Sequence, residues 1–211
     1  LAEALGAIGA ADGSVGGVSV RESSDAVFRD CVFVDNRDNW DGIGAVRVAS
    51  GSTATFERCT FMGHEERRVF VVESGSHLTL PDCTIAMNAG YLETVIDAGP
   101  ASTVSISNSV LAFNDCQAMI DGGTVVTVSH CCLYQTGADS LYVPGGRGSN
   151  LRVDPLLCGL AEGDYTLCAN SPCLPTNNEW TESIGAYDEG CPRCNSPVES
   201  VTWGVIKALY R

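Results

Sequence analysis

The chain repeats one short pattern of apolar and polar positions along most of its length. A single column marks the repeat, and it holds Cys31, Cys59, Cys83, Ser109 and Cys131. Successive members lie 28, 24, 26 and 22 residues apart, which averages 25 residues. Apolar residues stand five and three positions before each member and two positions after it. Since the side chains of a strand point alternately to its two faces, this spacing predicts half-buried β-strands.

Two further features recur with the same period. A shorter apolar strand precedes the marked one, and Gly, Ser or Asp residues separate the two, as turns require. Its copies are residues 18–20, 46–48, 70–72 and 95–96. Five positions after the marked column comes a second column that is mainly asparagine, with the members Asn36, His64, Asn88, Asn114 and Thr136.

Few architectures fit two or three short strands in 25 residues with no room for a crossover helix. A propeller blade needs about 40 residues, and a leucine-rich repeat has its own leucine and asparagine signature. A coiled stack of parallel strands fits, because each coil lies about 4.8 Å above the last and places like residues over like. The asparagine column then lies inside a turn, where its amides hydrogen-bond to the coils above and below.

These residues resemble a known family. The repeat is similar to the right-handed parallel β-helix of the pectin-lyase-like superfamily, especially to secreted bacterial proteins whose coils read Gly-Gly-x-x followed by Cys/Ser-x-Phe-x-x-Asn. Residues 16–137 carry that pattern. Four motifs in the continuation, at 154–158, 163–167, 171–173 and 184–187, resemble the terminal segment that closes many such proteins. The resemblance implies an all-β, right-handed parallel β-helix of about five to seven coils, located outside the cell or on a bacterial cell surface.

We expect three regions along the chain. Residues 1–15 form an N-terminal cap, residues 16–190 form the β-helix with cysteine-rich closing coils from 138, and residues 191–211 form a linker and tail. Leu1, Leu5 and Ile8 have helical spacing and predict a short helix over the first coil. Because the chain opens at Leu1 with no signal peptide, we expect any such segment to have been removed.

The C-terminal tail has an amphipathic pattern of its own. Thr202 is a candidate helix N-cap, and the residues that follow place an apolar set on one face. That set is Trp203, Ile206, Leu209 and Tyr210. Two interpretations stay open: the tail packs on the last coil, or it serves secretion, anchoring or docking between subunits. We take these residues as assembly candidates.

Composition limits the partners of the chain. It has 12 Lys and Arg against 26 Asp and Glu, a formal net charge of −14. Such a charge argues against nucleic acid and anionic membrane surfaces as partners, because both need a cationic face. No apolar run approaches the roughly 18 residues of a membrane span. The expected partners are other copies of the chain, other surface proteins or a glycan.

The best candidate site for a cation lies in the first two coils. Asp38 and Glu66 both follow the repeat cysteine by seven residues, so they are expected to stack. Carboxylate oxygens suit Ca²⁺, and the alternative is a solvated acidic loop. No further cofactor is expected, since the three histidines are dispersed and the Cys-x-x-Cys of Cys191 and Cys194 has no second pair at zinc spacing. Nucleotide-binding and hydrolase motifs are absent from the sequence.

The 11 cysteines divide into two groups. Those of the repeat column would stack about 4.8 Å apart, farther than the ~3.8 Å between Cβ atoms that a disulfide prefers. We therefore expect a ladder of buried thiols there. The turn-rich closing region holds the disulfide candidates Cys158, Cys168, Cys173, Cys191 and Cys194. Five cysteines leave one over, for which Cys116 or Cys132 is a candidate partner.

Three hypotheses on function remain. The leading hypothesis is a secreted or cell-surface, non-enzymatic β-helix that acts as a structural or adhesive module, with self-assembly into filaments through the coil ends and the tail. The alternative is a polysaccharide lyase or glycoside hydrolase that acts on an extracellular glycan through the face of Asp38 and Glu66. The third hypothesis is a surface that binds a glycan without cleaving it, although the chain has few aromatic residues to form such a surface.

Overall fold

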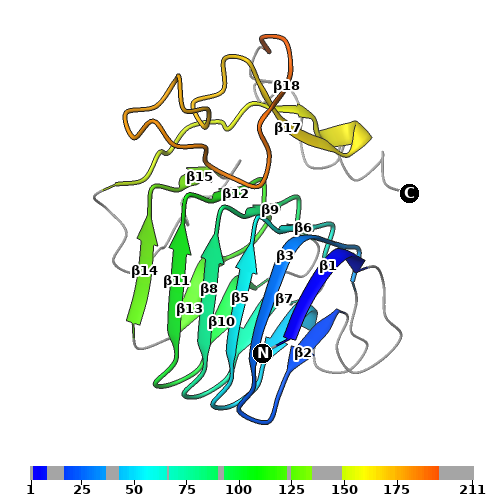
Figure 1. Ribbon diagram of the computed structural model, residues 1–211, viewed down its shortest axis with the longest axis vertical. Coiled ribbons are helices and arrows are strands. Elements are labelled where there is room, and N and C mark those ends of the chain that lie inside the picture. The colour runs from blue at the N-terminus through cyan, green and yellow to red at the C-terminus, as the bar shows by residue number, and fades with distance from the viewer. Residues whose placement is uncertain are drawn as a thin grey trace.

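The computed structural model is built almost entirely of short β-strands (Figure 1). It describes residues 2–8, 17–36, 43–65, 67–89, 93–122, 125–134 and 149–194. The strands of the coiled part are β1 (Ala2–Ile8), β2 (Val18–Val20), β3 (Asp25–Val34), β4 (Ile43–Val48), β5 (Thr53–Glu57), β6 (Thr60–Met62), β7 (Arg68–Val72), β8 (His77–Pro81), β9 (Thr84–Ala86), β10 (Thr94–Ala98), β11 (Thr103–Ser107), β12 (Val110–Ala112), β13 (Ala118–Gly122), β14 (Val125–Ser129) and β15 (Cys132–Tyr134).

These strands form a parallel coiled stack of about six turns. We name its three sheet faces by their strands. The long face runs in the order β14-β11-β8-β5-β3, the short face in the order β3-β6-β9-β12-β15, and the back face in the order β13-β10-β7-β4-β2. The long strand β3 belongs to both the long and the short face. The pairing places residues of the same repeat column opposite one another, such as Phe28 with Phe56, so the predicted all-β parallel β-helix is confirmed.

The core fills the space enclosed by the three faces with stacked apolar side chains. Phe28 stacks on Phe56 and Phe33 stacks on Phe61, each pair with ring centroids 4.6 Å apart. Phe70 on the back face meets Phe61 edge to face. Later coils place Leu80, Ile85, Ile106 and Leu111 in the same interior. Repeated apolar columns therefore become continuous ladders of buried side chains, and the burial of their surface stabilises the coil stack.

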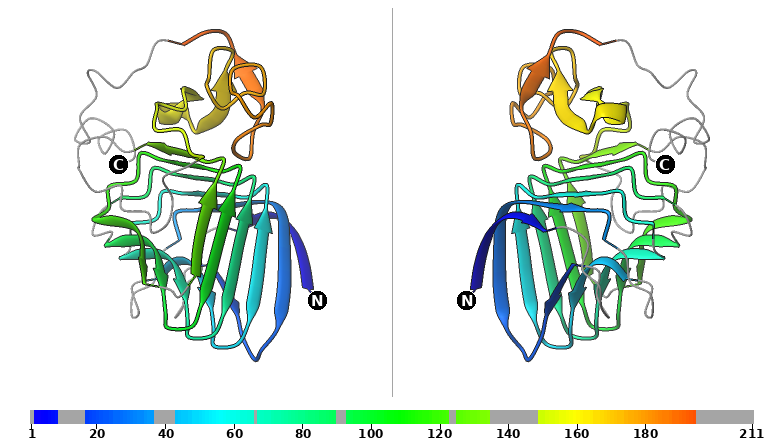
Figure 2. Two further views of the ribbon diagram at one scale, coloured as in Figure 1. Left: turned by 90° about the vertical axis from the view of Figure 1, so that its left-hand side faces the viewer. Right: turned by 90° about the vertical axis from the view of Figure 1, so that its right-hand side faces the viewer.

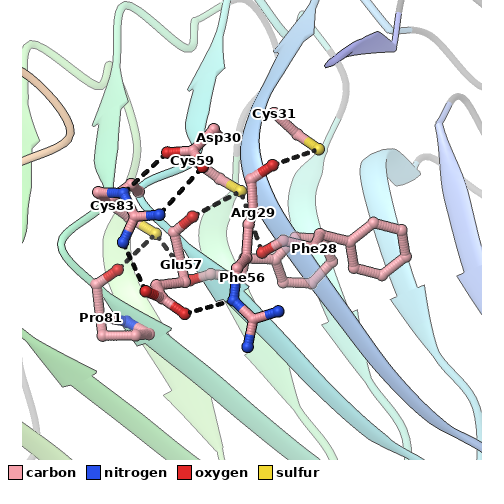
Figure 3. Close-up of polar contacts among 10 residues, drawn as sticks. Phe28, Arg29, Asp30, Cys31, Phe56, Glu57, Cys59, Pro81 and Cys83 are labelled. Atoms are coloured by element: carbon pink, nitrogen blue, oxygen red, sulfur yellow. Dashed lines mark hydrogen bonds and ion pairs between the residues drawn. The ribbon is translucent and has the colours of Figure 1, made fainter. Parts of the chain in front are cut away.

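The repeat column is the predicted ladder of buried thiols. Cys31, Cys59, Cys83 and Cys131 are buried and form no disulfide. Each thiol lies within hydrogen-bond reach of the carbonyl group two residues before it, as Cys83 does with Pro81 at 3.3 Å. From Cys59 onward the thiol also faces a carbonyl of the preceding coil, as Cys83 does with Phe56 at 3.0 Å (Figure 3). Ser109 makes the corresponding pair of bonds through its hydroxyl group, which explains why serine substitutes for cysteine in this column.

The asparagine column forms a buried ladder at a turn. The amide oxygen of Asn114 accepts the backbone N–H of Asn88 at 3.2 Å, and that of Asn88 accepts the N–H of His64 at 3.1 Å. The side-chain amides of Asn88 and Asn114 donate to the carbonyl groups of Phe61 and Ile85. The expected role of the column, which is to satisfy buried backbone groups between coils, is therefore confirmed from coil to coil.

The N-terminal segment differs from the expected helix. Ala2–Ile8 is strand β1, which pairs in parallel with β3 and shows a register shift between Ala4 and Gly6. The expectation of a helix was wrong, because the backbone groups along the edge of β3 need partners that a strand supplies and a helix does not. Gly6 also disfavours a helix at this place.

The closing segment, residues 149–194, covers the short face rather than adding further coils. It contains β16 (Leu157–Gly159), a 3-10 turn at Leu160–Glu162, β17 (Asp164–Cys168) and β18 (Glu189–Cys191), and these strands form a separate three-stranded sheet. Figures 1 and 2 show this segment lying over β6, β9, β12 and β15, along the side of the stack. Its buried side chains, including Leu167 and Ile184, pack on Met62, Val110 and Cys132 of the short face.

One motif explains the close approach of this segment. The backbone N–H of Ala186 donates to the Thr84 hydroxyl at 3.0 Å, and Gly185 donates to the carbonyl of Asn108 at 2.7 Å. Gly185 has φ +105°, and a Cβ atom there would lie 2.9 Å from Val110. The Ile-Gly-Ala motif is therefore a contact motif, since glycine alone tolerates both this backbone conformation and this proximity.

Candidate functional site

The outer side of the long face carries an array of hydroxyl groups. The pairing of the strands aligns the outward-facing residues of this face in rows that cross the strands. One such row consists of Val27, Thr55, Thr79, Ser105 and Thr127. We call the eight hydroxyl residues on β5, β8, β11 and β14 the hydroxyl face. They are Thr53, Thr55, Thr79, Thr103, Ser105, Ser107, Thr127 and Ser129. The array lies on the sheet that faces the viewer in Figure 1.

The hydroxyl face is nearly uncharged, although the chain is strongly acidic. The outward positions of β8, β11 and β14 hold no Asp, Glu, Lys or Arg. Neighbouring strands in a sheet lie about 4.8 Å apart, and alternate residues of one strand lie about 6.6 Å apart. Threonine is stiff at χ1, so such an array presents its hydroxyl groups at defined positions. The surface is suited to multiple weak hydrogen bonds with a regular polymer.

Arginine and carboxylate side chains occupy the earlier coils of the same sheet. Arg29 pairs with Glu57 at 2.9 Å, and Arg58 pairs with Asp30 at 2.7 Å and also with Glu57 (Figure 3). Hydrogen bonding to these guanidinium groups lowers the pKa of both Asp30 and Glu57 below the ordinary values. These carboxylates are therefore ionised and paired, and they link one coil to the next rather than exchange protons.

A different carboxylate lies where the stack meets the closing segment. Burial raises the pKa of Asp82 above its ordinary value, and the charge of Glu182 adds to this, whereas a hydrogen bond from Asn108 opposes it. His130 of the last coil stacks on Trp180, with ring centroids 4.9 Å apart, and lies 4.0 Å from a carboxylate oxygen of Glu182. A carboxyl group whose pKa is raised by burial is one of the features found in sites of acid–base chemistry.

Asp82 belongs to a structural column that sequence reasoning did not single out. Asp30, Arg58, Asp82, Asn108 and His130 each precede a member of the repeat column and have φ between +48° and +55°. The sharp turn from the long to the short face demands this left-handed conformation, which Asn and Asp adopt more readily than most residues. The signal was available in the sequence as Asp, Arg, Asp, Asn and His at one fixed offset.

The predicted sites have different outcomes. Asp38 and Glu66, the calcium candidates, lie outside the described residues, as do the tail residues Trp203, Ile206, Leu209 and Tyr210. Among the disulfide candidates, Cys158 pairs with Cys191 and Cys168 with Cys194. Cys173, the fifth candidate, is a free buried thiol. It contacts Cys132, one of the two partners considered for it.

Comparison with protein families decides the identity of the fold. The model of the right-handed β-helix region matches residues 11–154, which is more than half of the chain. The chain belongs to the right-handed β-helix family. No curated protein and no solved structure matches this β-helix protein.

The match also separates the two parts of the β-helix protein. It ends at residue 154, close to where the closing segment leaves the coil stack at Leu151, which still bridges to Cys132. In the described part of the chain, no helix is long and apolar enough to cross a membrane.

Proposed function

We propose that the protein is a structural and adhesive module, secreted or displayed on a cell surface, that binds neutral glycan polymers through its hydroxyl face. The observation that carries this proposal is the nearly uncharged array of ordered hydroxyl groups on a chain whose net charge is −14. The chain's charge repels acidic polymers, so neutral ones are the favoured ligands. The two disulfides of the closing segment support an oxidising location outside the cytoplasm.

The rigidity of the β-helix supports binding by many weak contacts. Each hydroxyl bond exchanges a bond to water for one to the ligand and contributes little alone. A preordered array loses little conformational freedom on binding, so the small contributions add to a useful affinity. The long face also matches an extended polymer better than a small sugar, because successive coils repeat the same groups along one line.

A binding assay on insoluble neutral polysaccharides tests the proposal. The probes are microcrystalline cellulose and chitin, incubated with the full chain and separated by centrifugation. We expect at least one of these polysaccharides to retain the protein. We expect this retention to be lost in the triple variant Thr79→Val, Ser105→Ala, Thr127→Val. The substitution Asp121→Asn on the exposed end of β13 is the matched control and is expected to bind as the natural chain does. No retention, or retention unchanged in the triple variant, would refute the proposal.

Self-assembly is the second part of the proposed role. Among the described strands, β13 and β14 end their sheets, and Val125 on β14 is 53% exposed. The edge of a strand that ends a sheet can pair with a strand of another copy, and a head-to-tail contact of that kind generates filaments. Sedimentation and electron microscopy of the full chain at high concentration test this part, and a strict monomer would contradict it without affecting the glycan assay.

A glycan-cleaving enzyme is the second candidate function, and the raised pKa of Asp82 is the observation that favours it. In this alternative protonated Asp82 donates a proton to the leaving glycosidic oxygen while a water molecule attacks the anomeric carbon and releases its proton to solvent, and Trp180 contacts the sugar ring. The test is release of reducing ends or unsaturated products from a panel of plant and bacterial glycans. Asp82→Asn is expected to abolish turnover and Asp30→Asn to retain it. Absence of turnover, or equal turnover in both variants, would remove this candidate.

A further inference from the structure

Four cysteines meet at one edge of the closing segment. Cys158 lies on β16, Cys168 ends β17, Cys191 ends β18, and Cys194 follows three residues later. The sheet order β16-β17-β18 brings them together although they span 37 residues of sequence. They form two disulfides, Cys158–Cys191 and Cys168–Cys194, which lie against each other.

The sulfur atoms of the two disulfides are closely spaced. The Sγ of Cys191 lies 3.5 Å from that of Cys168 and 3.7 Å from that of Cys194. The sulfurs of Cys158, Cys168 and Cys191 all lie within 4.8 Å of one another. In a tetrahedral zinc site with Zn–S bonds of about 2.3 Å, the sulfurs are about 3.8 Å apart. The two contacts that Cys191 makes with the sulfurs of the other disulfide therefore already have the spacing of a tetrathiolate site.

The chain around the cluster has further features of a zinc site. Cys191-Pro-Arg-Cys194 is a Cys-x-x-Cys turn, the spacing from which structural zinc sites are built. The other two cysteines of the cluster, Cys158 and Cys168, are ten residues apart on the two strands of a hairpin. Because that spacing is not one of the usual zinc-site spacings, the sequence alone does not indicate this second pair. Cys158, Cys191 and Cys194 are partly exposed, so a cation can reach three of the four sulfurs from solvent, whereas Cys168 and the free thiol Cys173 are fully buried.

We propose that Cys158, Cys168, Cys191 and Cys194, once reduced, bind one Zn²⁺ ion as a tetrathiolate site. Each disulfide takes two electrons and two protons from a low-molecular-weight thiol reductant, which is itself oxidised to a disulfide. The four thiols formed then release four protons as the metal binds. The closing segment thus has two alternative cross-links at one place, a metal in a reducing compartment and two disulfides in an oxidising one. This inference does not depend on the proposed glycan binding.

A cobalt titration of the reduced full chain tests the proposal. The protein is reduced anaerobically with a phosphine, freed of reductant and titrated with Co²⁺, which reports a tetrahedral thiolate site by its charge-transfer and visible d–d bands. The expected result is saturation at one Co²⁺ per chain, with bleaching when Zn²⁺ is added. Cys191→Ser is expected to lose the tetrathiolate spectrum, and Cys173→Ser, the matched control in the same segment, to keep it. No such spectrum in the reduced chain, or its survival in Cys191→Ser, would overturn the proposal.

A second measurement uses the natural sequence, so it tests the proposal even if the Cys191→Ser variant misfolds. The reduced chain is treated with iodoacetamide with and without Zn²⁺, and the modified cysteines are located by mass spectrometry. Zn²⁺ is expected to protect the four cluster cysteines together while leaving the modification of the other seven unchanged. Equal modification of the four with and without the metal would overturn the proposal.

Discussion

His64 makes the stability of the coil stack depend on pH. It is the one histidine of the buried asparagine ladder, and its side chain has no exposed surface. Its Nδ1 accepts the backbone N–H of Asn36 at 3.1 Å, as the amide oxygens of Asn88 and Asn114 do for the coils before them. The proton of the neutral ring therefore lies on Nε2, which has no partner among the described residues. A second proton would occupy Nδ1 and remove the acceptor.

The magnitude follows from the pKa. Burial lowers the pKa of His64 from 6.5 to about 4. Because the unfolded chain binds the proton more strongly, the contribution of neutral His64 to stability is fully present above pH 6.5 and is lost as the pH falls toward 4. Integration over these values gives a loss of about 2 kcal/mol at pH 5 and about 3 kcal/mol below pH 4.

The assay compares urea unfolding of the natural chain and His64→Asn at pH 7.5 and pH 5, followed by circular dichroism. Asparagine keeps the acceptor and does not titrate in this range. The loss of unfolding free energy between the two pH values is expected to be about 2 kcal/mol smaller in the variant. His77→Asn, at an exposed position, controls for the removal of a histidine and is expected to behave as the natural chain does. Equal pH dependence of the natural chain and His64→Asn would refute the reasoning.

Three further predictions follow from packing and burial. Phe56→Ala, which removes a ring from the middle of the stacked core, should lower the free energy of unfolding by about 3–5 kcal/mol, and a loss below about 1 kcal/mol would contradict the packing. Gly185→Ala should destabilise the closing segment more than Gly75→Ala, since both have positive φ but only Gly185 faces close neighbours; equal melting temperatures would contradict this. The seven cysteines outside the disulfides are all buried, and burial raises the pKa of Cys131 to about 12. At pH 8 a thiol reagent should therefore modify these seven only after denaturation, and their rapid reaction in the native protein would contradict this.

The cysteine and asparagine columns show how far the sequence determined the fold. Each coil contacts the next at a nearly constant sequence separation, so a residue suited to the interior must recur at that separation. The recurrence is visible in the chain and predicts the strands, the buried thiols and the hydrogen-bonded ladder. His64 fits the same rule, because its Nδ1 replaces an amide oxygen.

The closing segment and the N-terminus show what only the tertiary structure decided. The segment packs on the short face through contacts such as that between Ala186 and Thr84, 102 residues apart. The repeat in the sequence does not predict a contact of this kind. The pairing of the cysteines follows from that packing, as does the charge interaction of Glu182 with Asp82. Ala2–Ile8 forms a strand because the edge of β3 lacks partners, although its own apolar spacing is helical. Repeated contacts between neighbouring coils leave a signal in the sequence, whereas unique contacts between distant segments depend on the shape of the surfaces that meet.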